Sequence, residues 1–375
     1  MARQLTIADR VISDDSEPYV IAEIGHNHQG NLKTAKDIFR AAAENGASAV
    51  KLQKRDNRAL FTREMFDKPY DNENSFGATY GEHREALEFS KAEYEALAAE
   101  AARLKVTFFA TAFDMPSADF LAALNMPAYK ISSGDLKNTP LITHVATIGK
   151  PMVISTGGAT IEDVQRAYDT IMPINPQLCI LQCTAGYPAE NTELDLGVIT
   201  TFREQFPDAV IGYSGHDNGI AMPLAAYMLG ARVIEKHFTL SRSMKGTDHS
   251  FSLEPVGMKK MVRDLGRVWV ALGDGRKKVY ASEAGPLLKM GKKLVAARDL
   301  SSGHVLTAAD IAIKSPSDGL PPYYLDQVLG QALARELHTD DAITLDLLVP
   351  PAGASVGRVK SDGTPTAGGT PTAGA

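Results

Sequence analysis

Polar and ionisable side chains recur near the ends of short apolar runs in this sequence, and their types suit acid–base and anion chemistry. A lysine placed in such a run is costly to bury unless an anion pairs with it. Lys51 and Lys130 therefore predict a clamp for a phosphate or a carboxylate, and the loop STGGAT (155–160) supports an anionic substrate. A Schiff-base lysine and an internal salt bridge to Glu23 are the alternatives.

Two histidines at the ends of consecutive runs predict a metal site. Residues two apart on a strand share one face, so Ser214 lies with His216, and Glu235 lies with His237. Imidazole combined with carboxylate and water suits Mn, Zn, Fe or Co better than Ca. One histidine alone would indicate a hydrogen bond to the backbone, but the pair, together with Glu235 and Asp248, favours a divalent metal. Two protein ligands leave coordination positions for substrate and water.

Eight short β-branched runs alternate with helical patterns and predict the fold. They are YVIAEI (19–24), SAVKLQ (48–53), VTFFAT (106–111), AYKIS (128–132), MVIST (152–156), LCILQC (178–183), AVIGYS (209–214) and RVIEKH (232–237). Strands that are apolar on both faces and alternate with helices pair in parallel. We predict a (β/α)8 TIM barrel, whose active site lies at the C-terminal ends of the strands. The alternative is an open doubly wound sheet, but no GxGxxG follows any run.

The connection at residues 54–90 is longer than the barrel pattern requires, and loops of this length are usually functional or disordered. Its aromatic residues are Phe61, Phe66, Tyr70, Phe76 and Tyr80. We therefore expect a folded segment that covers the substrate. The aromatic side chains either pack within the segment or stack on a sugar.

Composition excludes several classes of partner. The chain has 375 residues, 44% of them apolar, and a formal net charge of −6 without a basic run, which argues against nucleic acid and anionic membranes. Two cysteines, Cys179 and Cys183, form no disulfide framework and indicate a reducing compartment, and we interpret both as packing residues. No signal-peptide core or membrane span is recognisable, so we expect a cytoplasmic protein.

The pattern changes after the barrel and indicates a second domain. We predict a catalytic barrel at 1–275, a polar linker at 276–285, a small β-rich domain at 286–350 and a disordered tail at 351–375, where GTPTAG occurs twice. From the residues alone, the function is metal-assisted chemistry on a small anionic substrate. Carbon–carbon bond formation and hydrolysis both fit this description.

Ten motifs, read together and in order, resemble the sialic acid synthase (N-acetylneuraminate synthase) family. They are IAEIGHNHQG, AVKLQ, TYGEHREALEFS, YKISSGD, STGGAT, LQCTAGYP, IGYSGHDNGI, VIEKHFTL, KGTDHSFSLEP and ALGDG, and the resemblance covers roughly residues 18–349. Residues 286–350 are similar to the family's SAF domain, a β-clip fold like that of type III antifreeze protein.

The resemblance implies a reaction and the residues that perform it. Phosphoenolpyruvate would condense with the open-chain aldehyde of an N-acylhexosamine, usually N-acetylmannosamine, to release a nonulosonic acid and phosphate. A divalent ion, Mn first with Mg or Co as alternatives, would bind His216 and His237. The catalytic groups would be Glu23, Glu235, Lys51 and Lys130. Phosphoenolpyruvate would lie against Lys51, Thr111, Lys130, Ser133 and Ser214, the sugar against Gln53, Tyr187 and Asp248, and Asp135 matches an acidic family position.

Two positions depart from the family pattern. Ala185 stands where many bacterial members have asparagine and others serine. Lys314-Ser315-Pro316 stands where bacterial members often carry an arginine that reaches the partner's sugar. TYGEHREALEFS and SGHDNG resemble the animal-type branch, which takes a 6-phosphorylated sugar. Free and phosphorylated sugars both stay open, with the free sugar placed first. The candidate phosphate ligands, which are otherwise solvated charges, are Arg55, Arg58, Arg63 and Lys68.

The resemblance also implies a homodimer in which each SAF domain covers the other subunit's barrel, and a domain of this size needs a surface to pack on. Three other functions are considered. They are a related phosphoenolpyruvate-dependent 3-deoxy-sugar-acid synthase that acts on another aldose, a metal-dependent aldolase that uses pyruvate, and a non-catalytic sugar- or ice-binding homologue. A protein that only binds a ligand has no use for a two-histidine metal site, so the non-catalytic homologue is disfavoured.

Overall fold

The computed structural model describes residues 3–351, which divide into two compact units, one ending at Asp274 and one beginning at Gly275. In the first unit, eight parallel strands close into a barrel in the order β10-β3-β4-β5-β6-β7-β8-β9. They are β3 (Tyr19–Gly25), β4 (Ala49–Lys54), β5 (Thr107–Ala112), β6 (Tyr129–Ile131), β7 (Met152–Ser155), β8 (Leu178–Cys183), β9 (Val210–Gly215) and β10 (Val233–His237). The predicted TIM barrel is confirmed, and each predicted run ends within one residue of the observed strand.

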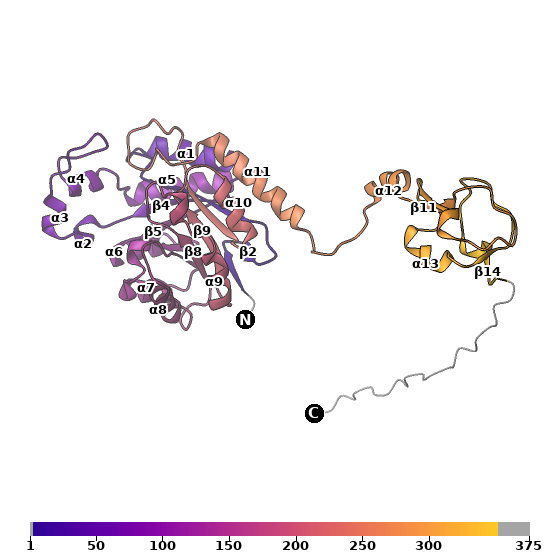
Figure 1. Ribbon diagram of the computed structural model, residues 1–375. Coiled ribbons are helices and arrows are strands. Elements are labelled where there is room, and N and C mark those ends of the chain that lie inside the picture. The colour runs from indigo at the N-terminus through magenta and orange to yellow at the C-terminus, as the bar shows by residue number, and fades with distance from the viewer. Residues whose placement is uncertain (1–2, 352–375) are drawn as a thin grey trace, which may run out of the picture. The chain divides into compact units, whose positions relative to one another are not determined.

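Helices surround the strands of the barrel (Figure 1). They are α1 (Leu32–Glu44), α5 (Lys91–Leu104), α6 (Met115–Ala123), α7 (Thr139–Thr147), α8 (Ile161–Ile171), α9 (Val198–Gln205), α10 (Ala221–Met228) and α11 (Pro255–Leu272). Asn31 caps α1 by accepting the Thr34 N–H, and Thr160 forms a capping box with Asp163 at α8. The apolar faces of the helices pack on the outer surface of the barrel strands, and this burial stabilises the helices.

A hairpin that the sequence analysis did not predict precedes the barrel. Strands β1 (Gln4–Ile7) and β2 (Arg10–Ser13) pair antiparallel, and Leu5, Ile7 and Ile12 join the cluster of apolar residues inside the barrel. That cluster includes the first residues of several barrel strands, so the hairpin packs against their N-terminal end. Each hairpin strand has only four residues, too few for a periodic signal. The C-terminal end of the barrel is left for the polar residues.

The long connection is folded, as expected. It contains α2 (Asn57–Leu60), α3 (Arg63–Asp67) and α4 (Tyr80–Glu85). Phe66 is buried against Gly81, where an added Cβ would lie 2.3 Å from the phenyl ring. The Tyr80 ring meets Phe61 and Tyr70 edge-on, with centroids 5.1 and 5.4 Å apart. These aromatic side chains therefore pack within the segment.

The second unit is a small β-rich fold with its own core, built from Leu294, Leu300, Leu306, Val328, Leu333, Leu337 and Ile343 among others. β11 (Lys293–Ala296) pairs antiparallel with β12 (Ile311–Lys314), and β13 (Ala332–Leu333) pairs with β14 (Leu348–Val349). Helix α12 (Ala284–Met290) begins inside the segment that we expected to be a linker, and α13 (Leu325–Val328) is the other helix of the described part of this unit. The predicted disordered tail, apart from Pro351, lies outside the described residues.

Six short 3-10 turns complete the described structure: η1 (Ser133–Asp135), η2 (Asn191–Glu193), η3 (Ala281–Glu283), η4 (Ala308–Asp310), η5 (Pro322–Tyr324) and η6 (Leu345–Leu347). Among the residues described, no helix has the length and apolar character that a membrane crossing needs.

Candidate active site

A cavity of about 580 Å³ opens at the C-terminal ends of the barrel strands. Every predicted site residue except Asp135 lines it: Glu23, Lys51, Gln53, Thr111, Lys130, Ser133, Tyr187, Ser214, His216, Glu235, His237 and Asp248. Asp135 is instead buried in the turn η1, where it accepts hydrogen bonds from Ser132 Oγ (2.6 Å) and Asn138 Nδ2 (3.4 Å). Asp135, which the resemblance assigned to the substrate, is absent from the lining of this cavity, and its carboxylate holds that turn.

Strand register brings the charged groups together. Glu23 lies opposite Lys51 in the β3–β4 ladder, and the Lys51 Nζ is 2.5 Å from Glu23 Oε2. The same ammonium donates to Thr111 Oγ1 at 3.0 Å. The internal salt bridge considered for Lys51 is thus present, and it offsets the cost of burying both charges.

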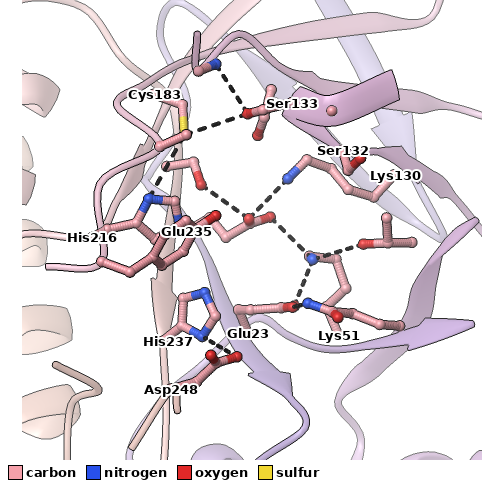
Figure 2. Close-up of a pocket in the computed structure, with 18 of the residues that line it drawn as sticks. Glu23, Lys51, Lys130, Ser132, Ser133, Cys183, His216, Glu235, His237 and Asp248 are labelled. Atoms are coloured by element: carbon pink, nitrogen blue, oxygen red, sulfur yellow. Dashed lines mark hydrogen bonds and ion pairs between the residues drawn. The ribbon is translucent and has the colours of Figure 1, made fainter. Parts of the chain in front are cut away.

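The second lysine meets the second carboxylate in the same way (Figure 2). Lys130 Nζ is 2.8 Å from Glu235 Oε1, and Ser214 donates to that oxygen at 3.1 Å. Lys51 Nζ lies 3.7 Å from Glu235 Oε2, so the two lysines share this carboxylate. All four side chains are almost fully buried. Two ammonium groups and two carboxylates therefore face one another in this network.

The two carboxylates differ in their pKa values. Burial raises the pKa of Glu23 above its ordinary value, and the attraction of Lys51 only partly counters it. Burial would also raise the pKa of Glu235, but Lys130 and Lys51 together bring it down to about 2. Two carboxylates with pKa values pushed apart are typical of sites that divide proton transfer from charge stabilisation.

The two histidines present nitrogen atoms that fit a divalent metal. His216 Nδ1 is 2.8 Å from the Thr184 carbonyl, which only accepts, so Nδ1 carries the proton and Nε2 the lone pair. His237 Nδ1 is buried without a hydrogen-bond partner and lies 3.6 Å from Asp248 Oδ2. Burial lowers the pKa of both imidazoles to about 4, so both are neutral, as metal ligands must be. No group of three or more His, Cys, Asp or Glu side chains among the described residues is arranged as a metal site, so the protein itself would supply few ligands.

One wall of the cavity is built from small residues. Ser133 Oγ accepts the Gly157 N–H at 2.9 Å, and a Cβ on Gly157 would lie 2.9 Å from both Ser133 Oγ and Ala185 Cβ. Glycine is therefore required for this close approach of the STGGAT loop. Burial raises the pKa of the Cys183 thiol, which disfavours a nucleophilic role and agrees with its interpretation as a packing residue.

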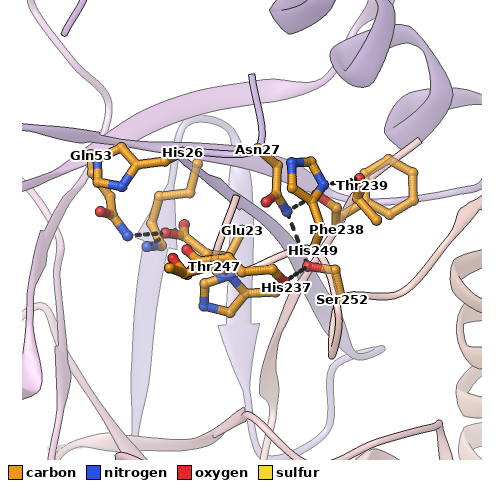
Figure 3. Close-up of polar contacts among 12 residues, drawn as sticks. Glu23, His26, Asn27, Gln53, His237, Phe238, Thr239, Thr247, His249 and Ser252 are labelled. Carbon is orange, nitrogen blue, oxygen red and sulfur yellow. Dashed lines mark hydrogen bonds and ion pairs between the residues drawn. The ribbon is translucent and has the colours of Figure 1, made fainter. Parts of the chain in front are cut away.

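Asp248 reaches the cavity from the loop after β10. Hydrogen bonds of Asn27 with Phe238 and Ser252 fix this loop to the loop after β3 (Figure 3). Asn27 Nδ2 donates to the Phe238 carbonyl at 2.9 Å and to Ser252 Oγ at 3.0 Å. Ser252 Oγ in turn donates to the Asp248 carbonyl at 2.5 Å. Gly25 is part of the same arrangement, since its φ is +52° and a Cβ there would lie 3.0 Å from Asp248 Oδ2.

The Asn27→Ala variant is expected to raise the KM for the substrate that contacts Asp248 by about 10-fold, because two buried acceptors lose their donor at a cost of about 1–3 kcal/mol. Steady-state kinetics and thermal unfolding measure this effect. Gln29→Ala is the matched comparison, since Gln29 donates to the Lys245 carbonyl of the same loop from an exposed position. An equal effect of the two variants would contradict a buried positioning role for Asn27.

Sequence reasoning gave no role at the cavity to several residues that line it, including His26, Arg84, Phe113 and Thr247. Arg55 lines the cavity, whereas the other candidate phosphate ligands, Arg58, Arg63 and Lys68, do not. Arg84 stands within TYGEHREALEFS, so a family motif was the one signal for it. In the second unit, Lys314 forms an ion pair with Asp340, and Ser315 Oγ accepts from Lys292 Nζ at 2.6 Å.

A closed eight-stranded barrel with buried acid–base groups at the C-terminal ends of its strands is the architecture of a TIM-barrel enzyme. Residues 38–277 match the NeuB family and residues 293–349 match the SAF domain. The chain belongs to the NeuB family of sialic acid synthases and carries a C-terminal SAF domain, as the resemblance implied.

Relatives of known function are similar over most of their length. N-acetylneuraminate-9-phosphate synthase of Homo sapiens is 39% identical over 88% of this chain and 92% of that protein. N,N'-diacetyllegionaminic acid synthase of Legionella pneumophila is 34% identical over 85% of this chain and 91% of that protein. The crystal structure of N-acetylneuraminic acid synthetase from Leptospira borgpetersenii superposes with a TM-score of 0.67 at 29% identity, over 76% of this chain and 95% of that one. The protein is accordingly an enzyme of the synthase type.

Proposed function

We propose that this enzyme condenses phosphoenolpyruvate with the open-chain aldehyde of an N-acylhexosamine, and that it releases a nonulosonic acid and inorganic phosphate. The observation that carries the proposal is the buried Lys51–Glu235–Lys130 network in the same cavity as the paired His216 and His237. The named relatives make acids of this class. Free and 6-phosphorylated sugars, and acyl groups other than acetyl, are all compatible with this reaction.

Binding of phosphoenolpyruvate is assigned to the lysines and the hydroxyl groups around them. Lys51 and Lys130 supply positive charge, and Thr111, Ser133 and Ser214 surround it with hydroxyl groups. Gln53 donates to Glu23 Oε1 at 2.8 Å and, with Tyr187 and Asp248, forms the part of the cavity assigned to the sugar. The two substrates then meet between the carboxylates.

The chemistry forms a bond between C3 of phosphoenolpyruvate and the aldehyde carbon, adds water at C2 and breaks the C2–O bond to the phosphate. The two hydrogens of the water end on the former aldehyde oxygen, which becomes a hydroxyl group, and on the released phosphate. A divalent metal, with Mn first and Mg or Co as alternatives, would be held by His216 and His237 and would act as a Lewis acid on the aldehyde oxygen. Glu235, between two lysines, stabilises the positive charge that develops at C2. Glu23 takes the proton of the attacking water on its carboxylate.

Phosphate release from phosphoenolpyruvate tests the proposal. The assay contains Mn and a panel of free and 6-phosphorylated hexoses and N-acylhexosamines, and mass spectrometry identifies the product. Release with one N-acylhexosamine, and a product heavier by the pyruvate unit, is the expected result. Release only with an aldose that lacks the acylamino group would replace this function by that of a 3-deoxy-sugar-acid synthase. Condensation with pyruvate and without phosphate would indicate an aldolase.

We further propose a homodimer in which each SAF domain covers the partner's barrel. Exposed apolar side chains on α12 and in the strand β12, which are Leu287, Leu288, Met290 and Ile313, support a partner surface for this unit. Removal of residues 286–375 is then expected to leave a folded barrel with a KM for the sugar raised by about 10-fold or more, at a nearly unchanged KM for phosphoenolpyruvate. Steady-state kinetics and circular dichroism measure this outcome, and an unchanged KM for both substrates would contradict it.

A further inference from the structure

Arg55 and Arg84 bring two positive charges to one wall of the cavity without a carboxylate partner. Among the described residues, neither guanidinium lies within 4.0 Å of an Asp or Glu oxygen. The nearby carboxylates are already paired, Glu88 with Lys54 at 2.8 Å and Glu85 with Arg58 at 3.3 Å. Arg55 is only 7% exposed. A buried guanidinium without a carboxylate partner is costly, so the Arg55 side of this wall favours a bound anion.

Both ring nitrogens of His26 face guanidinium groups. Arg55 Nη1 lies 2.9 Å from His26 Nε2, and Arg84 Nη1 lies 3.0 Å from His26 Nδ1. A neutral imidazole has one lone pair and one N–H, and a guanidinium only donates, so one of the two contacts sets N–H against N–H. Desolvation and the two arginines hold the pKa of His26 well below its usual value, so protonation does not resolve the conflict. The cluster has more donors than acceptors.

The other contacts of Arg55 and Arg84 hold their guanidinium groups in place, and the N–H groups that find no acceptor face the cavity. The Arg55 guanidinium stacks on Phe113, 3.6 Å from the ring centroid, and donates to Gln53 Oε1 at 2.7 Å. The Arg84 guanidinium donates to Tyr80 Oη at 2.8 Å through Nη2. His26, Arg55 and Arg84 all line the cavity of the active site. Rigid, planar donors of this kind suit phosphoryl oxygens better than a single negative charge.

The position of the cluster separates it from the lysine clamp. Arg55 follows the C-terminal residue of β4 and stands four residues beyond Lys51, so the backbones of the two residues lie at most about 13 Å apart. Gln53 lies between the two and bridges them, since it donates to Glu23 and accepts from Arg55. Gln53 is one of the residues assigned to the sugar. One small anion on Lys51 and Lys130 therefore leaves Arg55 and Arg84 for a second anionic group at the far end of the sugar.

We propose that His26, Arg55 and Arg84 form a second anion subsite that binds a phosphoryl group on the sugar substrate, so that the enzyme prefers a 6-phosphorylated N-acylhexosamine to the free sugar. This inference rests on the proposed function and reverses the order in which the sequence analysis placed the two sugars. Loss of one charge-assisted hydrogen-bond donor costs about 1.5–3 kcal/mol, or about 10- to 100-fold in kcat/KM.

The test compares free N-acetylmannosamine with its 6-phosphate in the wild-type enzyme and in Arg84→Ala and Arg55→Ala. The wild type should prefer the 6-phosphate, and each variant should lose about 10- to 100-fold in kcat/KM with it and clearly less with the free sugar. Arg84→Lys should recover part of the loss because it keeps the charge. Arg58→Ala, in the same segment but 68% exposed at its side chain, is the matched control and should behave as the wild type.

Three outcomes would overturn the inference. The first is an equal loss of kcat/KM with both sugars in the arginine variants. The second is a wild-type preference for the free sugar. The third is inhibition by inorganic phosphate that competes with phosphoenolpyruvate and not with the sugar 6-phosphate. This inhibition experiment distinguishes binding of the sugar's phosphoryl group at the arginines from binding of free phosphate at Lys51 and Lys130. Calorimetry tests the subsite independently of turnover. The sugar 6-phosphate should bind the wild-type enzyme in the absence of phosphoenolpyruvate, and Arg84→Ala should weaken this binding. Binding of this kind without phosphate release from any sugar would contradict the proposed reaction and leave the subsite supported.

Discussion

Replacement of His216 or His237 by alanine is expected to reduce kcat for phosphate release by about 10³-fold or more, and to leave the fold intact. The two ring centroids lie 5.3 Å apart in the cavity, and each ring presents a nitrogen without a protein acceptor or donor. Electrostatic activation of a carbonyl is typically worth two to three orders of magnitude or about 3–4 kcal/mol. The lost side-chain contacts cost about 1 kcal/mol of stability, so the variants should unfold only slightly earlier.

The measurement pairs kinetics with metal content. Phosphate release is assayed with added Mn, and bound metal is measured by mass spectrometry of the dialysed protein, in both variants and in His144→Ala. His144 is on α7, on the outside of the barrel, where its Nε2 lies 2.7 Å from Asp119 Oδ1, so its replacement should change neither quantity. A His237→Ala enzyme with bound metal and a near wild-type rate would refute the assignment of this ligand.

The barrel could be predicted because each of its strands is a short apolar run with its own helix. A run such as LCILQC is buried on both faces, and its bounds agree with β8 residue by residue. Alternation along a strand then places Lys51 beside Gln53 and Glu235 beside His237, and the closure of the barrel brings them to one cavity. Residue type, spacing and strand order were therefore enough to place most of the predicted residues in one cavity.

The residues that were missed depend on contacts between segments far apart in the chain. Arg84 comes from α4 and reaches His26 after β3, 58 residues earlier, and no local pattern reports such a contact. The hairpin β1–β2 was missed for a related reason, since its apolar residues become meaningful only when they meet the barrel interior. Asp135 differs in the opposite sense, because the resemblance assigned it to the substrate whereas its carboxylate accepts hydrogen bonds from its neighbours outside the cavity lining.

Glu235→Gln is expected to lower both activity and stability, and a double variant separates the two effects. Without the carboxylate, Lys130 and Lys51 lose the charge that they share, and an uncompensated buried charge costs about 3–5 kcal/mol. Lys130→Met leaves Glu235 with Lys51 at 3.7 Å and with Ser214, so its loss of stability should be the smaller of the two. In both single variants, kcat for phosphate release should fall by about 10²- to 10³-fold.

The double variant Lys130→Met, Glu235→Gln removes both charges and should regain much of the lost stability, because no unpaired charge is left between these positions. Its activity should stay as low as that of the worse single variant, since the double change restores the charge balance but not the groups that bind and stabilise the reacting anion. Chemical denaturation and phosphate release are measured on the wild type, the two single variants and the double variant. They give one double-mutant cycle for stability and one for activity. Lys236, the neighbour of Glu235 on β10, pairs with Asp217 at 3.0 Å and supplies the matched control pair. Lys236 and Asp217 are absent from the cavity lining, so their single variants should lose stability with far less effect on kcat. Recovery of activity along with stability in the double variant would show that Glu235 and Lys130 serve the fold alone.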